Sequence, residues 1–136
     1  MLNSLAHVEI NVNDIQKTKN FYDIFLHLVW WKGFVIDEET IWYKAPDKTH
    51  IFFTKTNQEY TTYGFHRKHI WLNHFAFRVT TKQQVDDIAQ YLEKNGIPLL
   101  YTDRNRDYSH EYDMDEYYAI FCEDPDRIKV EIVYCQ

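Results

Sequence analysis

The sequence is poor in cysteine, with only Cys122 and Cys135 among its 136 residues. Two thiols are too few for the disulfide framework that holds many small secreted domains together. We therefore expect two reduced structural thiols in a cytoplasmic protein. The residues that follow Met1 also lack a basic segment followed by an apolar run, so we expect no signal peptide.

Long hydrophobic runs and an excess of positive charge are absent as well. No apolar stretch approaches the roughly 18 residues that a membrane-spanning helix needs, so no membrane partner is expected. The formal net charge is −6, whereas nucleic-acid binders neutralise phosphates with clustered lysine and arginine, so no nucleic-acid partner is expected. The 45% hydrophobic and 18% aromatic content instead predicts a globular protein with a hydrophobic core.

The chain contains an internal repeat. The segment around His7 matches the segment around His74 at an offset of 67 residues, and both read Leu-x-His followed by apolar residues at every second position. Such alternation predicts a β-strand. A second match, at an offset of 79 residues, aligns 41–54 with 120–133, and each copy predicts two strands joined by a Pro-Asp turn.

An amphipathic helix is predicted after the first strand of each copy. In the second copy Thr81 and Gln84 form a capping box, and Asn95 with Gly96 ends the helix. Asp14 occupies the position of Thr81 in the first copy. The residues expected to face the core share helical spacing: Thr18, Phe21, Tyr22 and Phe25 in the first helix, and Val85, Ile88, Ala89 and Leu92 in the second.

The two copies define two βαβββ modules, at about residues 4–56 and 70–135 of a single domain spanning 1–136. The remaining strands are predicted near residues 29–36 and 99–102. Strands and helices arranged in this way indicate the α+β fold class.

The second module is longer than the first. The two offsets differ by 12 residues, and the polar segment 103–116 is the natural place for the insertion. Both a lid over a site and a solvated loop fit its composition. Residues 57–70 are expected to form a polar linker.

Alternation along the strands places His7, His74 and Glu131 on the more polar faces. These faces either meet bulk water or line a cavity inside a curled sheet. Because the two histidines are repeat equivalents, a pseudo-two-fold axis would bring them together, with Glu131 on the same face. Two imidazoles and one carboxylate form a facial ligand set with open positions, so we predict one divalent metal ion: zinc, nickel, manganese, iron or cobalt.

At these residues the chain resembles the vicinal oxygen chelate superfamily, the glyoxalase/bleomycin resistance/dioxygenase proteins. The resemblance runs over about residues 4–134 and is most specific in the terminal hairpin, 117–131. It implies paired βαβββ modules forming a curled mixed sheet around a cavity. It also implies a metal ion in that cavity, a small-molecule substrate with two adjacent oxygens, and a homodimer.

The resemblance implies a metal-dependent enzyme of the lactoylglutathione lyase or dioxygenase type. Glyoxalase I enzymes commonly use four protein ligands, but the repeat partner of Glu131 is Phe52, which cannot bind a metal ion. This departure favours a three-ligand site and leaves the general base unassigned. Glu9 and His50 are candidates for the base.

Two alternatives remain open: a metal-free drug- or metabolite-binding protein of the bleomycin-resistance kind, and a fosfomycin-type resistance enzyme. The fosfomycin enzymes normally surround their phosphonate with several cationic and hydroxyl groups, and Lys129, Arg78 and Thr54 supply only part of such a set. Arg78 shares a face with His74, so it is also a candidate for binding an anionic group of another substrate.

Overall fold

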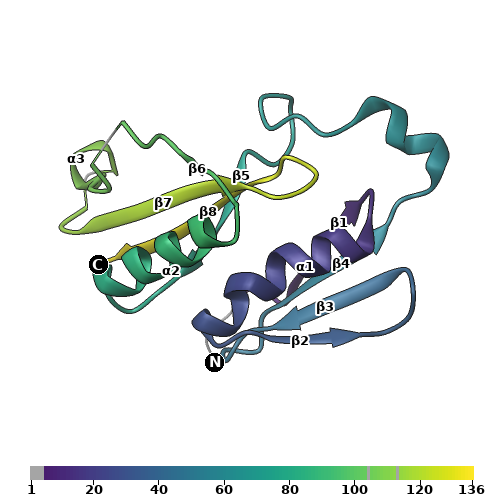
Figure 1. The fold of residues 1–136 in the computed structure, drawn as a ribbon, viewed down its shortest axis with the longest axis horizontal. Coiled ribbons are helices and arrows are strands. Elements are labelled where there is room, and N and C mark those ends of the chain that lie inside the picture. Colours follow the sequence, from purple (N-terminus) through teal and green to yellow (C-terminus); the bar gives the residue numbers. More distant parts are fainter. Residues whose placement is uncertain (1–4, 104, 113) are drawn as a thin grey trace. The chain divides into compact units, whose positions relative to one another are not determined.

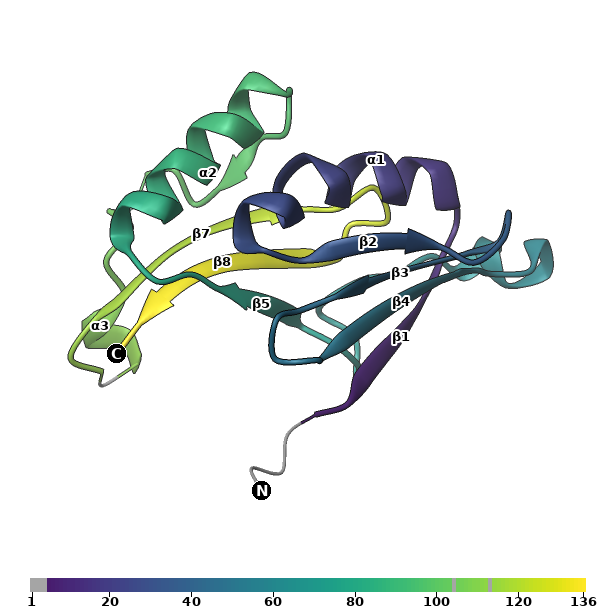
Figure 2. The same ribbon diagram turned by 90° about the horizontal axis from the view of Figure 1, so that it is seen from below.

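The computed structural model describes residues 5–103, 105–112 and 114–136. The chain forms two compact units, Met1–Gly64 and Phe65–Gln136 (Figures 1 and 2). Each unit has a four-stranded sheet with an α-helix along one of its faces. In the described part of the chain, no helix is both long enough and apolar enough to cross a membrane.

The first unit is a mixed sheet with strand order β1-β4-β3-β2. The outer strand β1 runs parallel to β4, and the other neighbours are antiparallel. Its elements are β1 (His7–Val12), α1 (Ile15–Phe25), a 3₁₀ helix (Leu26–Val29), β2 (Lys32–Val35), β3 (Thr40–Lys44), β4 (His50–Lys55) and a second 3₁₀ helix (Gln58–Tyr63). The second 3₁₀ helix lies in the segment predicted as a linker.

The second unit repeats this arrangement with strand order β5-β8-β7-β6. Again the first strand is parallel to the last, and the other pairs are antiparallel. Its elements are β5 (His74–Arg78), α2 (Lys82–Lys94), β6 (Leu99–Leu100), α3 (Ser109–Tyr112), β7 (Tyr117–Glu123) and β8 (Lys129–Cys135). The predicted α+β fold of two βαβββ modules is confirmed, whereas the interpretation of 1–136 as a single domain stays a prediction.

The strand registers of the two units correspond residue by residue. Glu9 stands opposite Phe52 in the first unit, and Ala76 stands opposite Glu131 in the second. These are the same positions that the two sequence offsets align. The duplication therefore extends from sequence to backbone hydrogen-bond register.

The helices begin and end close to where the sequence predicts. The Asp14 side chain accepts hydrogen bonds from the backbone N–H groups of Gln16 and Lys17, both at 3.0 Å, and caps α1. Thr81 accepts from the N–H of Gln84 at 3.1 Å and caps α2. The Gln84 side chain does not return to Thr81 as in a capping box; it accepts from the backbone N–H of Thr80 at 2.9 Å.

Both predicted helix faces are buried. In the first unit Tyr22 and Phe53 are fully buried, and their rings stack with centroids 4.4 Å apart. In the second unit Leu92 from α2 and Val130 from β8 are likewise fully buried. Burying a side chain of this size contributes about 1.5–3 kcal/mol, so the repeated apolar pattern accounts for how each helix is held on its sheet.

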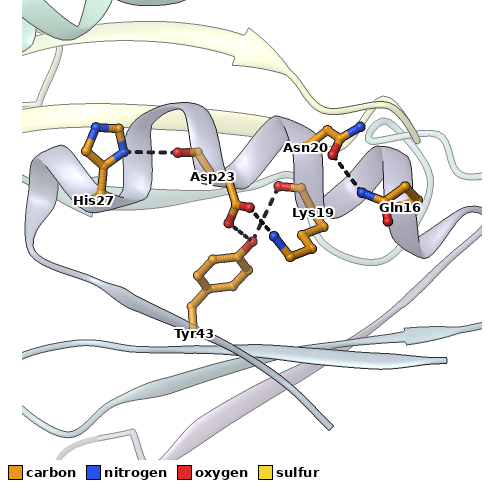
Figure 3. A network of polar contacts seen from close by, with 6 residues as sticks. All are labelled: Gln16, Lys19, Asn20, Asp23, His27 and Tyr43. Atoms are coloured by element: carbon orange, nitrogen blue, oxygen red, sulfur yellow. Dashed lines mark hydrogen bonds and ion pairs between the residues drawn. The ribbon is translucent and has the colours of Figure 1, made fainter. Parts of the chain in front are cut away.

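A polar network ties α1 to β3 in the first unit (Figure 3). The hydroxyl of Tyr43 donates to the carboxylate of Asp23 at 2.8 Å, and Lys19 forms an ion pair with the same carboxylate. Burial raises the pKa of the Tyr43 phenol above its ordinary value, and the hydrogen bond to Asp23 raises it further. The buried ring of Tyr43 therefore places its hydroxyl against an exposed ion pair.

Candidate metal centre

His74 and Glu131 lie side by side on two neighbouring strands of the second sheet. Parallel pairing of β5 with β8 puts both side chains on one face. Nε2 of His74 is 3.0 Å from Oε2 of Glu131. The glutamate residue is 0% exposed, whereas 28% of the histidine side chain is exposed. The side chains of these two residues therefore lie close together, as expected, and they do so within the second unit.

The two oxygens of Glu131 have different surroundings. Oε1 accepts a hydrogen bond from the Tyr117 hydroxyl at 2.6 Å. Oε2 is buried and accepts no hydrogen bond, because the approach of the His74 ring does not have hydrogen-bond geometry. Leaving a buried charged oxygen without a partner costs about 1–3 kcal/mol or more. Oε2 is thus an acceptor that a cation would satisfy.

The two ring nitrogens of His74 have different neighbours. Nδ1 is 2.7 Å from Oδ1 of Asn73, an amide oxygen that can only accept. With the proton on Nδ1, the lone pair of Nε2 is directed toward Oε2 of Glu131. In this tautomer both atoms present an electron pair across 3.0 Å, and a cation between them, either a proton or a metal ion, relieves the repulsion.

A divalent metal ion fits this pair of donors. Imidazole nitrogen and carboxylate oxygen each bind zinc at about 2.0–2.2 Å, which is compatible with the 3.0 Å separation. Metal-binding histidines also commonly donate their second ring N–H to an oxygen, as Nδ1 of His74 does toward Asn73. Within the described residues of the second unit, no further histidine, cysteine, aspartate or glutamate joins the pair.

His7 occupies the corresponding position in the first unit. It begins β1 and stands opposite His50 in the ladder with β4, just as His74 begins β5 and stands opposite Lys129. The His7 residue is exposed, and its ring meets the edge of Phe52 with centroids 5.7 Å apart. Its assignment as a metal ligand stays a prediction.

The other candidate residues lie on the same strand faces as the two histidines. Glu9 accepts a hydrogen bond from the Thr54 hydroxyl at 2.9 Å. His50 is half-buried, and its ring lies 5.1 Å from that of Trp42. Arg78 is exposed at the far end of β5 from His74. Roles for Glu9 and His50 as base, and for Arg78 in substrate binding, stay predictions.

The segment after β6 covers the sheet face that carries Glu131. Tyr108 is only 6% exposed and packs edge-on against Phe121, the residue directly opposite Glu131 in β7. Its backbone N–H donates to the carbonyl of Tyr117 at 2.7 Å, so this segment also extends the sheet edge. Within 103–116, Tyr108 therefore packs on the sheet, while most of the other described residues of the segment are exposed, so the choice between a lid and a solvated loop stays a prediction.

Sequence reasoning missed three residues that shape this centre: Asn73, Tyr108 and Tyr117. Alternation along β7 places Tyr117 on the same face as Phe121, so the strand pattern contained a signal for it. Asn73 precedes His74, and a neighbouring amide is a common partner for a ligating histidine. Nothing in the local pattern around Tyr108 indicates which face of the sheet it would cover.

Comparison with known proteins identifies the family. Residues 4–132 match the model of the Glyoxalase/Bleomycin resistance protein/Dioxygenase superfamily. The chain belongs to this superfamily. Its members commonly bind a divalent metal ion and small-molecule substrates, and they often form dimers.

Three relatives illustrate the range of similarity. The chain is 34% identical to the uncharacterized protein YqjT of Bacillus subtilis over 130 residues, covering 95% of this chain and 97% of YqjT. A crystal structure of a candidate glyoxalase from Bacillus halodurans matches with a TM-score of 0.85 and 38% identity, over 96% and 94% of the two chains. The fosfomycin resistance protein FosX of Listeria monocytogenes, crystallised with Mn(II) and sulfate, shares the fold at 19% identity and a TM-score of 0.67, over 100% and 93%.

Proposed function

We propose that this protein is a metal-dependent enzyme of the lyase or dioxygenase type. In this proposal His7, His74 and Glu131 hold one divalent metal ion, and a small substrate binds the metal through two adjacent oxygens. The observation that carries the proposal is the pairing of His74 Nε2 with the buried Oε2 of Glu131, which accepts no hydrogen bond. A buried carboxylate oxygen beside an imidazole nitrogen is suited to binding a cation.

The repeat supports His7 as the third ligand. His7 and His74 are equivalent by sequence offset, by strand and by ladder position. A ligand set that leaves coordination positions open suits a substrate that binds the metal directly. When bound, the ion would act as a Lewis acid that stabilises negative charge developing on a substrate oxygen.

The residues of this chain prepare the site in three ways. Tyr117 holds Oε1 of Glu131, which leaves Oε2 available to the metal ion. Asn73 holds Nδ1 of His74, which leaves Nε2 available. Tyr108 packs against Phe121, the residue directly opposite Glu131, and helps to bury this part of the sheet. Together these contacts fix donors that would otherwise rotate or be solvated.

Phe52 argues against the four-ligand arrangement of glyoxalase I. It stands at the position equivalent to Glu131, and its ring lies against Trp42 with centroids 5.7 Å apart. The base is then to be sought among other residues of the polar face. Glu9, which accepts from Thr54, and His50 are the candidates. A homodimer is part of the proposal on the ground of family resemblance, and a cytoplasmic location on the ground of the two thiols that we expect to be reduced.

A metal-free binding protein is the second candidate function, and one feature of the first unit favours it. Phe34, Trp42 and Phe52 are directly opposite one another on three neighbouring strands. Their rings stack, with centroid separations of 4.5 Å and 5.7 Å. A row of aromatic rings on a sheet face is suited to binding a flat apolar molecule without a metal ion.

Metal analysis of the purified protein distinguishes the two functions. We expect the wild-type chain to bind close to one equivalent of zinc or manganese, and His74→Ala to lose it. His27→Ala is the matched control, because this exposed histidine follows α1 in the first unit, where its Nδ1 lies 2.9 Å from the backbone carbonyl oxygen of Asp23. Negligible metal in all three proteins would refute the metal-dependent enzyme and favour the binding protein.

Three substrates then separate the chemistries. The hemithioacetal of methylglyoxal tests the lyase, a catechol tests the dioxygenase, and fosfomycin tests the resistance enzyme. Turnover of the hemithioacetal alone would show that Phe52 does not exclude the glyoxalase reaction. Turnover of fosfomycin alone would overturn the lyase or dioxygenase assignment while leaving the metal centre intact.

A further inference from the structure

Lys129 places a positive charge on the face that carries the candidate metal pair. It stands directly opposite His74 in the β5–β8 ladder and two residues before Glu131 on β8, so all three side chains share one face. Lys129 is half-buried, unlike an ordinary surface lysine. Lys129 is therefore a half-buried cation on the face that carries the pair.

The carboxylate best placed to neutralise Lys129 is already engaged. Glu123 stands directly opposite Lys129 in the β7–β8 ladder. One of its oxygens pairs with Arg67, and the other lies 3.5 Å from Nε of Arg127. Among the described residues, no carboxylate forms an ion pair with Lys129. The charge of Lys129 is thus available to a ligand.

Aromatic rings hold the Lys129 ammonium in place. Nζ lies 5.1 Å from the ring centroid of Phe121 and 5.8 Å from that of Tyr101. The rings of Tyr101 and Phe121 also meet edge-on, with centroids 5.6 Å apart. Tyr101 has a φ of 59°, a left-handed conformation that a residue with a side chain rarely adopts. Strained backbone thus positions one of the two rings that steady the ammonium.

We propose that Lys129 binds an anionic oxygen group of the substrate, such as a carboxylate or a phosphonate. This inference rests on the proposed function. The substrate oxygens that bind the metal ion would position the anionic group of the substrate relative to Lys129. The bound metal ion carries two positive charges, and Glu131 removes one. Lys129 therefore gives this face a clear positive excess in a chain whose net charge is −6. Such a site selects an anionic substrate over a neutral one of the same shape.

Two chelating probes that differ by one carboxylate test this inference. Catechol and 3,4-dihydroxybenzoate both offer two adjacent oxygens, but only the second carries an added anionic group. We expect the zinc-loaded wild-type protein to bind dihydroxybenzoate at least about 10-fold more tightly by calorimetry, as one charge-assisted hydrogen bond would provide. Lys129→Met should abolish this preference and leave catechol binding unchanged, while Lys129→Arg should retain part of it.

Lys94→Met is the matched control, because this exposed lysine lies in the last turn of α2. An equal affinity of the wild-type protein for both probes would overturn the inference, as would an equal loss of both in Lys129→Met. If Lys129→Met does not fold, Lys129→Gln takes its place.

A protein that binds no metal would refute the proposed function separately. In that case methylphosphonate is titrated against the metal-free protein. Binding that is lost in Lys129→Met would support the anion site, and no binding would overturn it.

Discussion

The hydroxyl of Tyr117 donates a 2.6 Å hydrogen bond to Oε1 of Glu131, so the two oxygens of this buried carboxylate are not equivalent. Oε1 is satisfied by the protein, and Oε2 faces His74 without accepting a hydrogen bond. A carboxylate held in this way has little freedom to rotate. The contact between β7 and β8 therefore determines which oxygen is presented to a metal ion.

Removing this hydroxyl should weaken metal binding. In Tyr117→Phe, Oε1 loses its donor and the carboxylate is no longer oriented, so we expect metal affinity to fall about 10- to 100-fold. Tyr118→Phe is a close control, because its hydroxyl also donates to a carboxylate, that of Asp86, at 2.9 Å but on the other face of the strand. Competition with a chromophoric chelator measures the metal affinity of both variants. Equal affinities in the two variants would contradict the orienting role of Tyr117.

Removing the Tyr108 ring should destabilise the second unit. Tyr108 is almost fully buried in a cluster with Ala119, Phe121 and Val133. Truncating a buried aromatic side chain to alanine typically costs about 3–5 kcal/mol, so Tyr108→Ala should lower the free energy of unfolding in urea by this amount. Tyr63→Ala removes a ring that is 88% exposed and should change it by less than about 0.5 kcal/mol. A similar small change in both would show that the segment is not a packed cover.

The Cys122 thiol should make the protein less stable at alkaline pH. Burial, with a smaller contribution from the nearby charge of Asp124, raises the pKa of this thiol to about 12. Above about pH 9 the unfolded chain loses the thiol proton while the folded chain keeps it. The free energy of unfolding should therefore fall as pH rises, and this thiol should account for at most about 1.4 kcal/mol per pH unit. Below pH 8 the thiol should make the free energy of unfolding no more dependent on pH.

Cys122→Val tests this origin of the alkaline instability. Urea unfolding between pH 8 and 10 should show a shallower decline in the variant than in the wild-type protein. Tyr43 is present in both proteins, so its ionisation near pH 10 cancels when the two slopes are compared. Identical slopes would show that the thiol is not the group responsible.

Tyr43 should stabilise the first unit, and its contribution should disappear at high pH. Tyr43→Phe keeps the buried ring but removes the donor to Asp23, which should cost about 0.5–1.5 kcal/mol. Because the pKa of the phenol is raised in the folded state, its contribution is fully present below about pH 10 and falls as pH rises above it. Urea unfolding at pH 8 and pH 11 should therefore show a smaller pH effect in Tyr43→Phe. Tyr60→Phe, altered at an exposed ring, should behave as the wild-type protein does.

Much of the architecture could be predicted because the repeat encodes it twice. Matching alternation around His7 and His74 indicated equivalent strands, and both open equivalent strands of the two sheets. The helix caps at Asp14 and Thr81 could also be predicted from the sequence, because a cap depends on residues within one turn. The capping box was wrong in one detail, since the Gln84 side chain turns to Thr80.

The centre itself was only partly predictable. Strand alternation placed His74 and Glu131 on the same face, and the pairing of β5 with β8 brings them to 3.0 Å. The cover formed around Tyr108 did not follow, because an insertion of polar composition can pack on a sheet or extend into water. The availability of Lys129 did not follow either, because it depends on Glu123 being engaged by Arg67 and Arg127.

The sequence by itself determined the strand and helix order, the duplication and the face on which each candidate ligand lies. These features depend on periodicity and on contacts between near neighbours, which a linear pattern records. Only the tertiary structure decided that Oε2 of Glu131 is buried without a donor while Oε1 is held by Tyr117. Whether a polar atom is satisfied depends on which distant side chains reach it, and that is settled only when the strands have paired and the core has packed.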